Sequence, residues 1–263
     1  MRGPEGRADP TPGGGRGIGN ACLASVAFLT RFPVDRRGRV EPQDIARGSV
    51  AFPIVGAAIG ALVAATAWAL HMAFPASVAA IGAVAALTLV TGALHLDGLA
   101  DTADAYGATT RERALEIMHD HAIGSYGTAA MIVDVVLKTV TIAALIDARD
   151  GLWMVVAAGA LSRAASGAVG MLVPSARAEG GMGSMLGAVA RPLRASYVAA
   201  IGVGIAWAAA GVRGLLASAV VAAATAFWSW RCRRRLGGIT GDTLGAASEG
   251  AEVLTLLVGL AFR

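Results

Sequence analysis

Repeated apolar runs of about 20 residues most constrain what this chain can fold into, because roughly 20 residues of helix cross the hydrocarbon core of a bilayer. Six such runs cover 49–72, 74–96, 122–146, 151–173, 195–212 and 214–230, and a seventh, 246–262, spans if it tilts little. An earlier run, 18–30, is too short to span as a straight helix. We expect an interfacial or re-entrant segment there.

Strands do not account for these runs, which are continuously apolar and rich in Ala, Gly and Val instead of alternating at every second residue. The chain is 56% hydrophobic and 15% charged, against roughly 45–50% and 25% in soluble domains. We predict an all-α polytopic integral membrane helical bundle of about six or seven transmembrane helices plus the short N-terminal segment. The 35 glycines are expected to let these helices approach closely.

The chain divides into a tail and one domain. The first 17 residues are rich in Gly, Pro and Arg and lack an apolar run, which predicts a disordered tail at 1–17 and no signal peptide. Residues 18–263 are expected to form a single integral membrane catalytic domain. Cys22 and Cys232 lie far apart without metal-ligand spacing, so neither a disulfide framework nor a zinc site is expected.

The distribution of Lys and Arg predicts the orientation. With a cytoplasmic N-terminus, most of the 22 basic residues face the cytoplasm, and only Arg149, Arg213 and Arg263 lie in loops outside. We expect a multi-pass protein of the cytoplasmic (inner) membrane, with its acidic motifs on the cytoplasmic side. The net charge of +4 then reflects topology, and no basic-aromatic motif predicts binding to nucleic acid.

The densest acidic motif, HLDGLADTAD at 95–104, follows the run at 74–96. On a helix, Asp97, Asp101 and Asp104 stand within about 60° of one face, and such like charges favour a hard divalent cation between them. Mg²⁺ is the natural candidate, and a solvated acidic loop is the alternative. His95 is either a substrate-binding residue or an interfacial one.

A second acidic set repeats every four residues in the segment after this motif. It comprises Glu112, Glu116 and Asp120. The spacing is typical of the solvated face of an amphipathic helix.

A third set lies near the C-terminus, in RCRRRLGGITGDTLG at 231–245. Arginines there anchor the topology or bind phosphate, and Asp242 is placed to hold a cation near phosphates. The backbone and side chains expected to cradle phosphate oxygens are those of Gly238, Thr240 and Gly241. Glu249 and Glu252 follow inside the last run, where they must face the bundle interior or water.

Three more charges lie inside predicted spans. Asp134 and Lys138 stand at i and i+4 and are expected to pair, while Arg163 lies in the middle of the next span. Intramembrane charges are functional candidates by default, although a structural ion pair that fixes helix register is the alternative. Arg163 is also a candidate to bind a substrate phosphate.

Three of these segments together, HLDGLADTADAYG, RERALEIMHDHAIGSYG and GGITGDTLGAASEGAE, resemble the adenosylcobinamide-GDP ribazoletransferase (cobalamin synthase) family. The resemblance begins at FLTRFPV, residues 28–34, and extends to the C-terminus. Because three separate motifs occur in the same order, it is far more specific than any one of them.

The resemblance implies an Mg²⁺-dependent membrane enzyme. Its substrates are a corrinoid nucleotide, adenosylcobinamide-GDP, and α-ribazole or its 5'-phosphate, and its products are adenosylcobalamin or its 5'-phosphate and GMP. Carried over, the first metal ligands are Asp97, Asp101 and Asp104, and Asp242, Glu249 and Glu252 complete the metal site. The resemblance implies that the four aspartates are also the catalytic residues.

Two other functions remain open from the residues alone. A small multi-span protein with intramembrane charges is compatible with a proton-coupled transporter of a small solute, although its acidic sets cluster on one face. A CDP-alcohol phosphotransferase is the nearer alternative, because Asp97-Gly98 matches the start of that family's DGxxAR motif. Asp101-Thr102 stands where the Ala-Arg of that motif would be.

Overall fold

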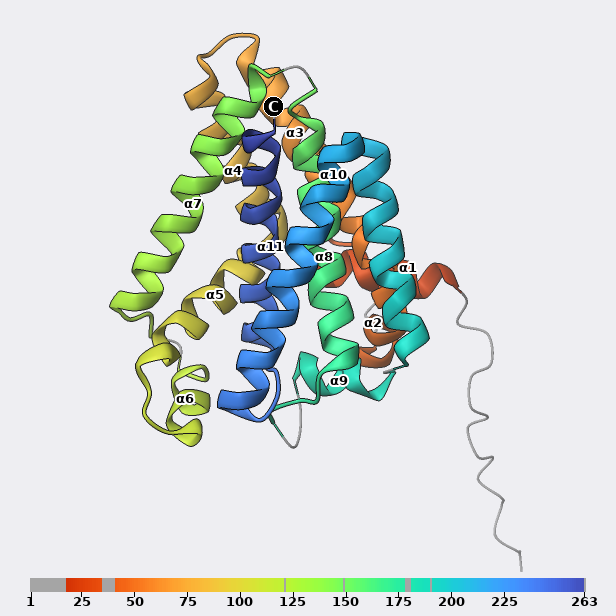
Figure 1. The fold of residues 1–263 in the computed structure, drawn as a ribbon, viewed down its shortest axis with the longest axis vertical. Helices are drawn as coiled ribbons and strands as arrows, with labels where there is room; N and C mark the ends of the chain where they lie inside the picture. The colour runs from red at the N-terminus through yellow and green to blue at the C-terminus, as the bar shows by residue number, and fades with distance from the viewer. Residues whose placement is uncertain are drawn as a thin grey trace, which may run out of the picture.

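The computed structural model describes residues 18–34, 41–120, 122–148, 150–177, 181–189 and 191–262, so the tail predicted at 1–17 lies outside the described residues. Within these ranges the chain forms helices and no strand. The α-helices are α1 (Ile18–Leu29), α2 (Pro42–Gly48), α3 (Phe52–His71), α4 (Ala76–Thr91), α5 (Leu94–Asp104), α6 (Arg111–Ile117), α7 (Ser125–Ile146), α8 (Trp153–Leu172), α9 (Met182–Ala188), α10 (Pro192–Leu236) and α11 (Gly241–Ala261). Figure 1 shows the long helices side by side.

Length and apolar composition would let five of these helices, α3, α7, α8, α10 and α11, cross a membrane, and α4 with α5 forms a sixth, bent candidate. The prediction of a polytopic helical bundle is therefore confirmed. α1 has only 12 residues, or about 18 Å of helix, which agrees with the short N-terminal segment expected from the sequence.

The 45 residues of α10 do not form one straight helix. Gly211 has non-helical backbone angles, φ 57° and ψ −133°, and a Cβ on Gly214 would collide with the carbonyl oxygen of Ala206. Residues eight apart cannot touch in this way along a straight helix, which rises 1.5 Å per residue. The two parts lie side by side in Figure 1, in agreement with the separate spans predicted at 195–212 and 214–230.

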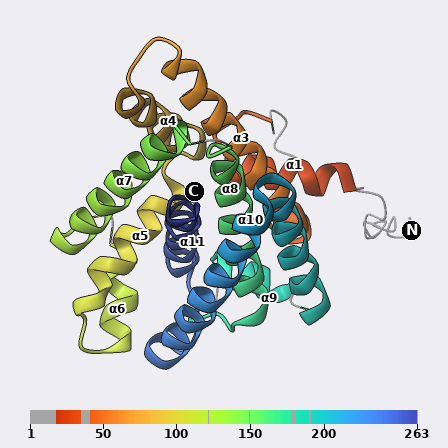
Figure 2. The ribbon, with the colours of Figure 1, turned by 45° about the horizontal axis from the view of Figure 1, so that its top comes forward.

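Helices α8 and α11 occupy the middle of the bundle. In α8, 89% of the 18-residue apolar stretch is buried, and in α11 67% is buried. The corresponding share is 28% in both α7 and α10. Figure 2 shows the same arrangement, with α7, α4, α3 and α10 around the two central helices. Small residues permit this packing: a Cβ on Gly56 of α3 would collide with the carbonyl oxygen of Gly159 of α8, and the reverse also holds.

The run predicted as one span at 74–96 is broken. α4 ends at Gly92, a left-handed C-cap with φ 62°, and Ala93 is also left-handed, with φ 58°. Glycine adopts this conformation without steric cost and commonly ends helices in this way. The chain then bends by 91° into α5. The predicted continuous span is therefore wrong here, and α5 carries the acidic motif to α11 instead.

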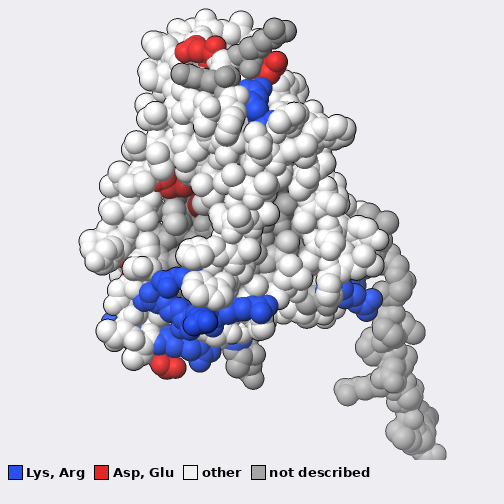
Figure 3. Space-filling model, viewed as in Figure 1, with Lys and Arg blue, Asp and Glu red and all other residues white. Residues whose placement is uncertain are grey.

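Basic side chains gather at one end of the bundle. Figure 3 shows Lys and Arg concentrated toward the lower end of this face, where α5, α6 and α9 and the connection from α10 to α11 lie in Figure 1. The two ends of the bundle therefore differ in charge, as the positive-inside pattern of the sequence predicts.

Candidate functional site where α5 meets α11

Two glycines bring the acidic helix α5 against the start of α11. A Cβ on Gly98 would stand 2.9 Å from the carbonyl oxygen of Asp242, and a Cβ on Gly245 would stand 3.0 Å from the carbonyl oxygen of His95. Larger side chains at either position would separate the helices. The two acidic motifs, about 145 positions apart in the sequence, therefore meet through direct backbone contact.

A pocket of about 160 Å³ lies beside this contact. His95 and Asp97 line it from α5, Gly241 and Asp242 from α11, and Ser166 from α8. Asp97 is exposed, whereas His95 is only 6% exposed and its Nδ1 has no hydrogen-bond partner among the described residues. The structure thus brings together four predicted site residues, the carboxylates of Asp97 and Asp242, the imidazole of His95 and the backbone of Gly241.

The other two aspartates of α5 differ in position. Asp104 does not point to the pocket but accepts hydrogen bonds from the backbone N–H groups of Gly124, at 2.7 Å, and Gly127, at 2.8 Å. Its carboxylate thereby satisfies donors at the N-terminus of α7, as a capping residue does. Asp101 is half-buried one turn after Asp97. Among the described residues, no group of three or more His, Cys, Asp or Glu side chains is placed to hold a metal ion.

Two of the three residues predicted to bind phosphate oxygens, Gly238 and Thr240, have structural roles. Thr240 is the N-cap of α11, where its hydroxyl accepts from the N–H of Thr243. A Cβ on Gly238 would collide with the carbonyl oxygen of Pro174, because this segment runs beside the one that follows α8. Gly241 lines the pocket, and a Cβ added to it would meet only the Cβ of Met182, at 3.6 Å. Of the three, Gly241 is the one that faces the pocket.

The same backbone pairing positions a residue that the sequence did not single out. Ser175 and Ile239 form an isolated parallel bridge, with the N–H of Ala176 donating to the carbonyl oxygen of Ile239 at 2.7 Å. Arg177 follows, and its Nη2 lies 3.6 Å from Oδ2 of Asp242. In the sequence, Arg177 looks like one more basic residue after a span, so only the pairing of two connections reveals its position.

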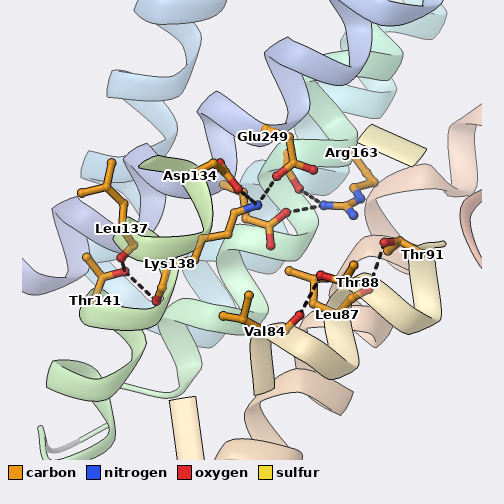
Figure 4. Close-up of polar contacts among 12 residues, drawn as sticks. Val84, Leu87, Thr88, Thr91, Asp134, Leu137, Lys138, Thr141, Arg163 and Glu249 are labelled. Atoms are coloured by element: carbon orange, nitrogen blue, oxygen red, sulfur yellow. Dashed lines mark hydrogen bonds and ion pairs between the residues drawn. The ribbon is translucent and has the colours of Figure 1, made fainter. Parts of the chain in front are cut away.

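Glu249 and Glu252 lie deeper in α11 and pair with cations of neighbouring helices. Figure 4 shows Lys138 of α7 reaching both Asp134 and Glu249. Lys138 Nζ lies 2.9 Å from Oδ2 of Asp134 and also donates to Oε2 of Glu249. Arg163 of α8 donates from Nη1 to Oε2 of Glu252 at 2.6 Å. The pairing predicted for Asp134 and Lys138 is confirmed.

This network is a fully enclosed set of paired charges. All five side chains are buried, and Arg163 is only 1% exposed. Burying isolated charges in an apolar interior is very unfavourable, whereas these have opposite charges at hydrogen-bond distance. The described contacts of Glu249, Glu252 and Arg163 thus hold α7, α8 and α11 together. Asp97 and Asp242 take no part in this buried network.

Two arginines of the C-terminal basic run also have structural contacts. Arg233 donates to the carbonyl oxygen of Leu172 at 2.8 Å. Arg235 donates to the carbonyl oxygen of Ala108 at 2.9 Å and lies over the ring of Tyr106, 4.9 Å from its centroid. Both side chains join connections at the basic end of the bundle.

The carboxylates that line the pocket match the way in which proteins usually bind Mg²⁺. Mg²⁺ usually keeps several waters and binds through one or two carboxylates together with substrate phosphates. Asp97 and Asp242 supply two carboxylates to one pocket, and the buried Oδ2 of Asp242 has no hydrogen-bond partner among the described residues. These features define a polytopic helical membrane protein with a carboxylate-lined site at its basic end.

The chain belongs to the cobalamin-5-phosphate synthase family, whose model matches residues 21–260. It is 37% identical over 239 residues to an adenosylcobinamide-GDP ribazoletransferase of Klebsiella pneumoniae, covering 89% of this chain and 97% of that protein. It is 39% identical to the protein of the same name from Sinorhizobium medicae, covering 88% and 92% of the two chains. No solved structure matches this one.

The protein is accordingly a membrane enzyme of cobalamin biosynthesis, acting in the final step of nucleotide loop assembly. The resemblance seen in the sequence motifs is thereby confirmed. The transporter and CDP-alcohol phosphotransferase alternatives lose their support, because similarity covers nearly the whole chain.

Proposed function

We propose that this protein transfers the adenosylcobinamide-phosphate group of adenosylcobinamide-GDP to α-ribazole or its 5'-phosphate and releases GMP. The observation that carries the proposal is the meeting of Asp97 and Asp242 in one pocket at the α5–α11 contact. Relatives that cover the chain almost completely carry the name of this activity.

The reaction exchanges the phosphoanhydride bond of the diphosphate for a new phosphate ester bond. A ribose hydroxyl of α-ribazole attacks the phosphorus on the corrinoid side of the diphosphate, and the bond to the bridging oxygen breaks so that GMP leaves. Such transfers depend mainly on positioning and on neutralising the charge of the phosphates. A pocket carboxylate accepts the hydroxyl proton as the new bond forms.

Asp97 and Asp242 would hold Mg²⁺ in this proposal, with the diphosphate of the substrate as a further ligand. When bound, Mg²⁺ neutralises phosphate charge and stabilises the leaving oxygen. The backbone contact at Gly98 sets the separation of the two carboxylates, since it fixes α5 against the first turn of α11. Asp101 follows Asp97 by one helical turn on α5.

We also propose that the basic end of the bundle faces the cytoplasm across the inner membrane. The site then opens on the side where nucleotides are made. Support comes from the excess of Lys and Arg at this end, which is the usual mark of cytoplasmic loops.

The decisive experiment is turnover by the purified full-length protein in detergent or vesicles. The protein is incubated with adenosylcobinamide-GDP and α-ribazole 5'-phosphate, with and without Mg²⁺, and the corrinoid product and GMP are separated by chromatography. We expect both products in equal amounts and only with Mg²⁺. Folded protein that makes neither product would refute the proposed activity, and equal turnover after chelation would refute the metal requirement.

A further inference from the structure

A polar groove next to the α5–α11 site has no role in the chemistry described so far. Its volume is about 620 Å³, within the roughly 300–1,000 Å³ of ligand pockets. The end of α6, the residues after it and Arg177 line the groove. The charged or titratable residues that line it are Arg113, Glu116, His119, Asp120 and Arg177.

Arg177 connects this groove to the pocket that holds Asp97. It lines the groove, and its Nη2 lies 3.6 Å from Oδ2 of Asp242, which lines the pocket. That separation exceeds a normal hydrogen bond. Both atoms are buried, and neither has a hydrogen-bond partner among the described residues.

Buried polar atoms without a hydrogen-bond partner cost free energy, so the pair marks a position where a bound group can complete the hydrogen bonding. A guanidinium lacks a hydrogen-bond acceptor, and phosphate oxygens are the acceptors that its planar geometry fits best. Oδ2 of Asp242 lacks a hydrogen-bond donor, and the Arg177 guanidinium 3.6 Å away is its ion-pair partner. A phosphate that accepts from Arg177, together with a cation held by Asp242, would satisfy both atoms.

Of the two carboxylates that line the groove, one is already paired and the other is available to bind a nucleobase. Arg113 and Glu116 form an ion pair, with Nη1 and Oε2 2.7 Å apart. Asp120 is exposed, and only its Oδ1 has a described contact, from the N–H of Ala122 at 3.2 Å. A carboxylate accepts well from adjacent donors such as the ring N–H and amino group of guanine.

We infer that this groove binds the GMP portion of the donor substrate, with Arg177 on its phosphate and Asp120 on the edge of the guanine. The inference rests on the proposed transfer reaction and extends it to the leaving group. When the bridging P–O bond breaks, its electron pair goes to the oxygen that departs with GMP. Arg177 donates hydrogen bonds to that phosphate as its negative charge increases, and the proton of the attacking hydroxyl goes to a pocket carboxylate.

The test compares Arg177→Gln with the wild-type protein in steady-state turnover. We expect the KM for adenosylcobinamide-GDP to rise about ten-fold or more, the loss for one charge-assisted hydrogen bond, while the KM for α-ribazole 5'-phosphate stays unchanged. Arg177→Lys should recover part of the loss, since it restores the charge without the planar fork. Arg213→Gln, beside the break of α10, is the control and should match the wild type.

An unchanged KM for adenosylcobinamide-GDP in Arg177→Gln would overturn the inference, as would an equal rise in both KM values. Wild-type turnover is measured first, so failure of the proposed reaction is distinguished from failure of this subsite. A second measurement uses the wild-type protein and so does not depend on folding of the variant. Photoactivated 8-azido-GMP should label the segment 111–120 or Arg177, and labelling confined to other segments would contradict the groove.

Discussion

At the scale of residues, carboxylates with the same sequence signal have different surroundings. Asp97 and Asp104 share one predicted face, but Asp97 lines the pocket and Asp104 accepts two N–H groups of α7. Gly124 and Gly127 permit that capping contact, because a Cβ on either would collide with the carboxylate. Spacing along one helix therefore identifies acidic candidates, but the neighbouring helix decides what each one binds.

The first prediction concerns the two pocket carboxylates. Asp97→Asn and Asp242→Asn should each lower kcat by at least about 100-fold, because a neutral amide is a poor Mg²⁺ ligand and leaves phosphate charge uncompensated. Turnover at saturating substrate measures the effect. Asp147→Asn, at an exposed pair with His71, is the control and should retain full activity. Full activity of Asp97→Asn would remove that residue from the metal site.

The second prediction concerns the buried pair of Arg163 and Glu252. Arg163→Met should destabilise the protein by about 3–5 kcal/mol, because it leaves Glu252 buried and unpaired. The double variant Arg163→Met/Glu252→Met should recover most of the loss. Unfolding in detergent, analysed as a double-mutant cycle, measures the coupling. Additive destabilisation by the two substitutions would show that the pair does not act as a unit.

At the scale of elements, the crossing of α5 and α11 makes the site. The break at Gly92 frees α5 from the direction of α4, and Gly98 and Gly245 let it contact α11. The isolated bridge between Ser175 and Ile239 adds the segment that carries Arg177. The connections α4–α5, α8–α9 and α10–α11 thus position the site, and the long helices fix where each connection lies.

The third prediction tests that crossing through Gly98→Ala. The added methyl group would stand 2.9 Å from the carbonyl oxygen of Asp242, so α5 must shift by a few tenths of an ångström. We expect kcat to fall about ten-fold or more as the carboxylates move apart, with about 1–3 kcal/mol lost from stability. Gly204→Ala has no atom within 4 Å of the new Cβ and is the matched control. Equal activity of both variants would contradict the importance of the contact.

At the scale of the whole molecule, charge is arranged in two ways. Basic side chains collect at one end of the bundle, where Arg233 and Arg235 donate hydrogen bonds to backbone carbonyl oxygens. Inside, the network of Lys138, Arg163 and their acidic partners joins α7, α8 and α11. The first arrangement predicts orientation, and the second fixes the relative positions of the central helices.

The fourth prediction tests the orientation. In a Cys22→Ser/Cys232→Ser background, Glu112→Cys on exposed α6 should react with a membrane-impermeant maleimide only when the cytoplasmic face is accessible. Arg213→Cys, near the break of α10, should react from the opposite side. Labelling in intact cells and in inverted vesicles measures both. Reaction of Glu112→Cys in intact cells would reverse the assigned topology.

How much the sequence predicts differs between these scales. The apolar runs predict the helical membrane bundle and the two parts of α10, and the i, i+4 spacing predicts the Asp134–Lys138 pair. The same reasoning fails at Gly92, because a short apolar run on each side of a bend looks continuous in sequence. It also misses Arg177, whose position depends on pairing between two connections.

The sequence by itself determined that this is a membrane protein. Each long apolar run must contact lipid or other helices, and this holds regardless of how the helices are arranged. The sequence also identified the acidic candidates, because charged side chains at or inside a membrane are costly to keep. Only the tertiary structure decided which carboxylates meet. Packing of small residues sets how helices cross, so Asp97 and Asp242 line one pocket, whereas Glu249 and Glu252 are neutralised by Lys138 and Arg163.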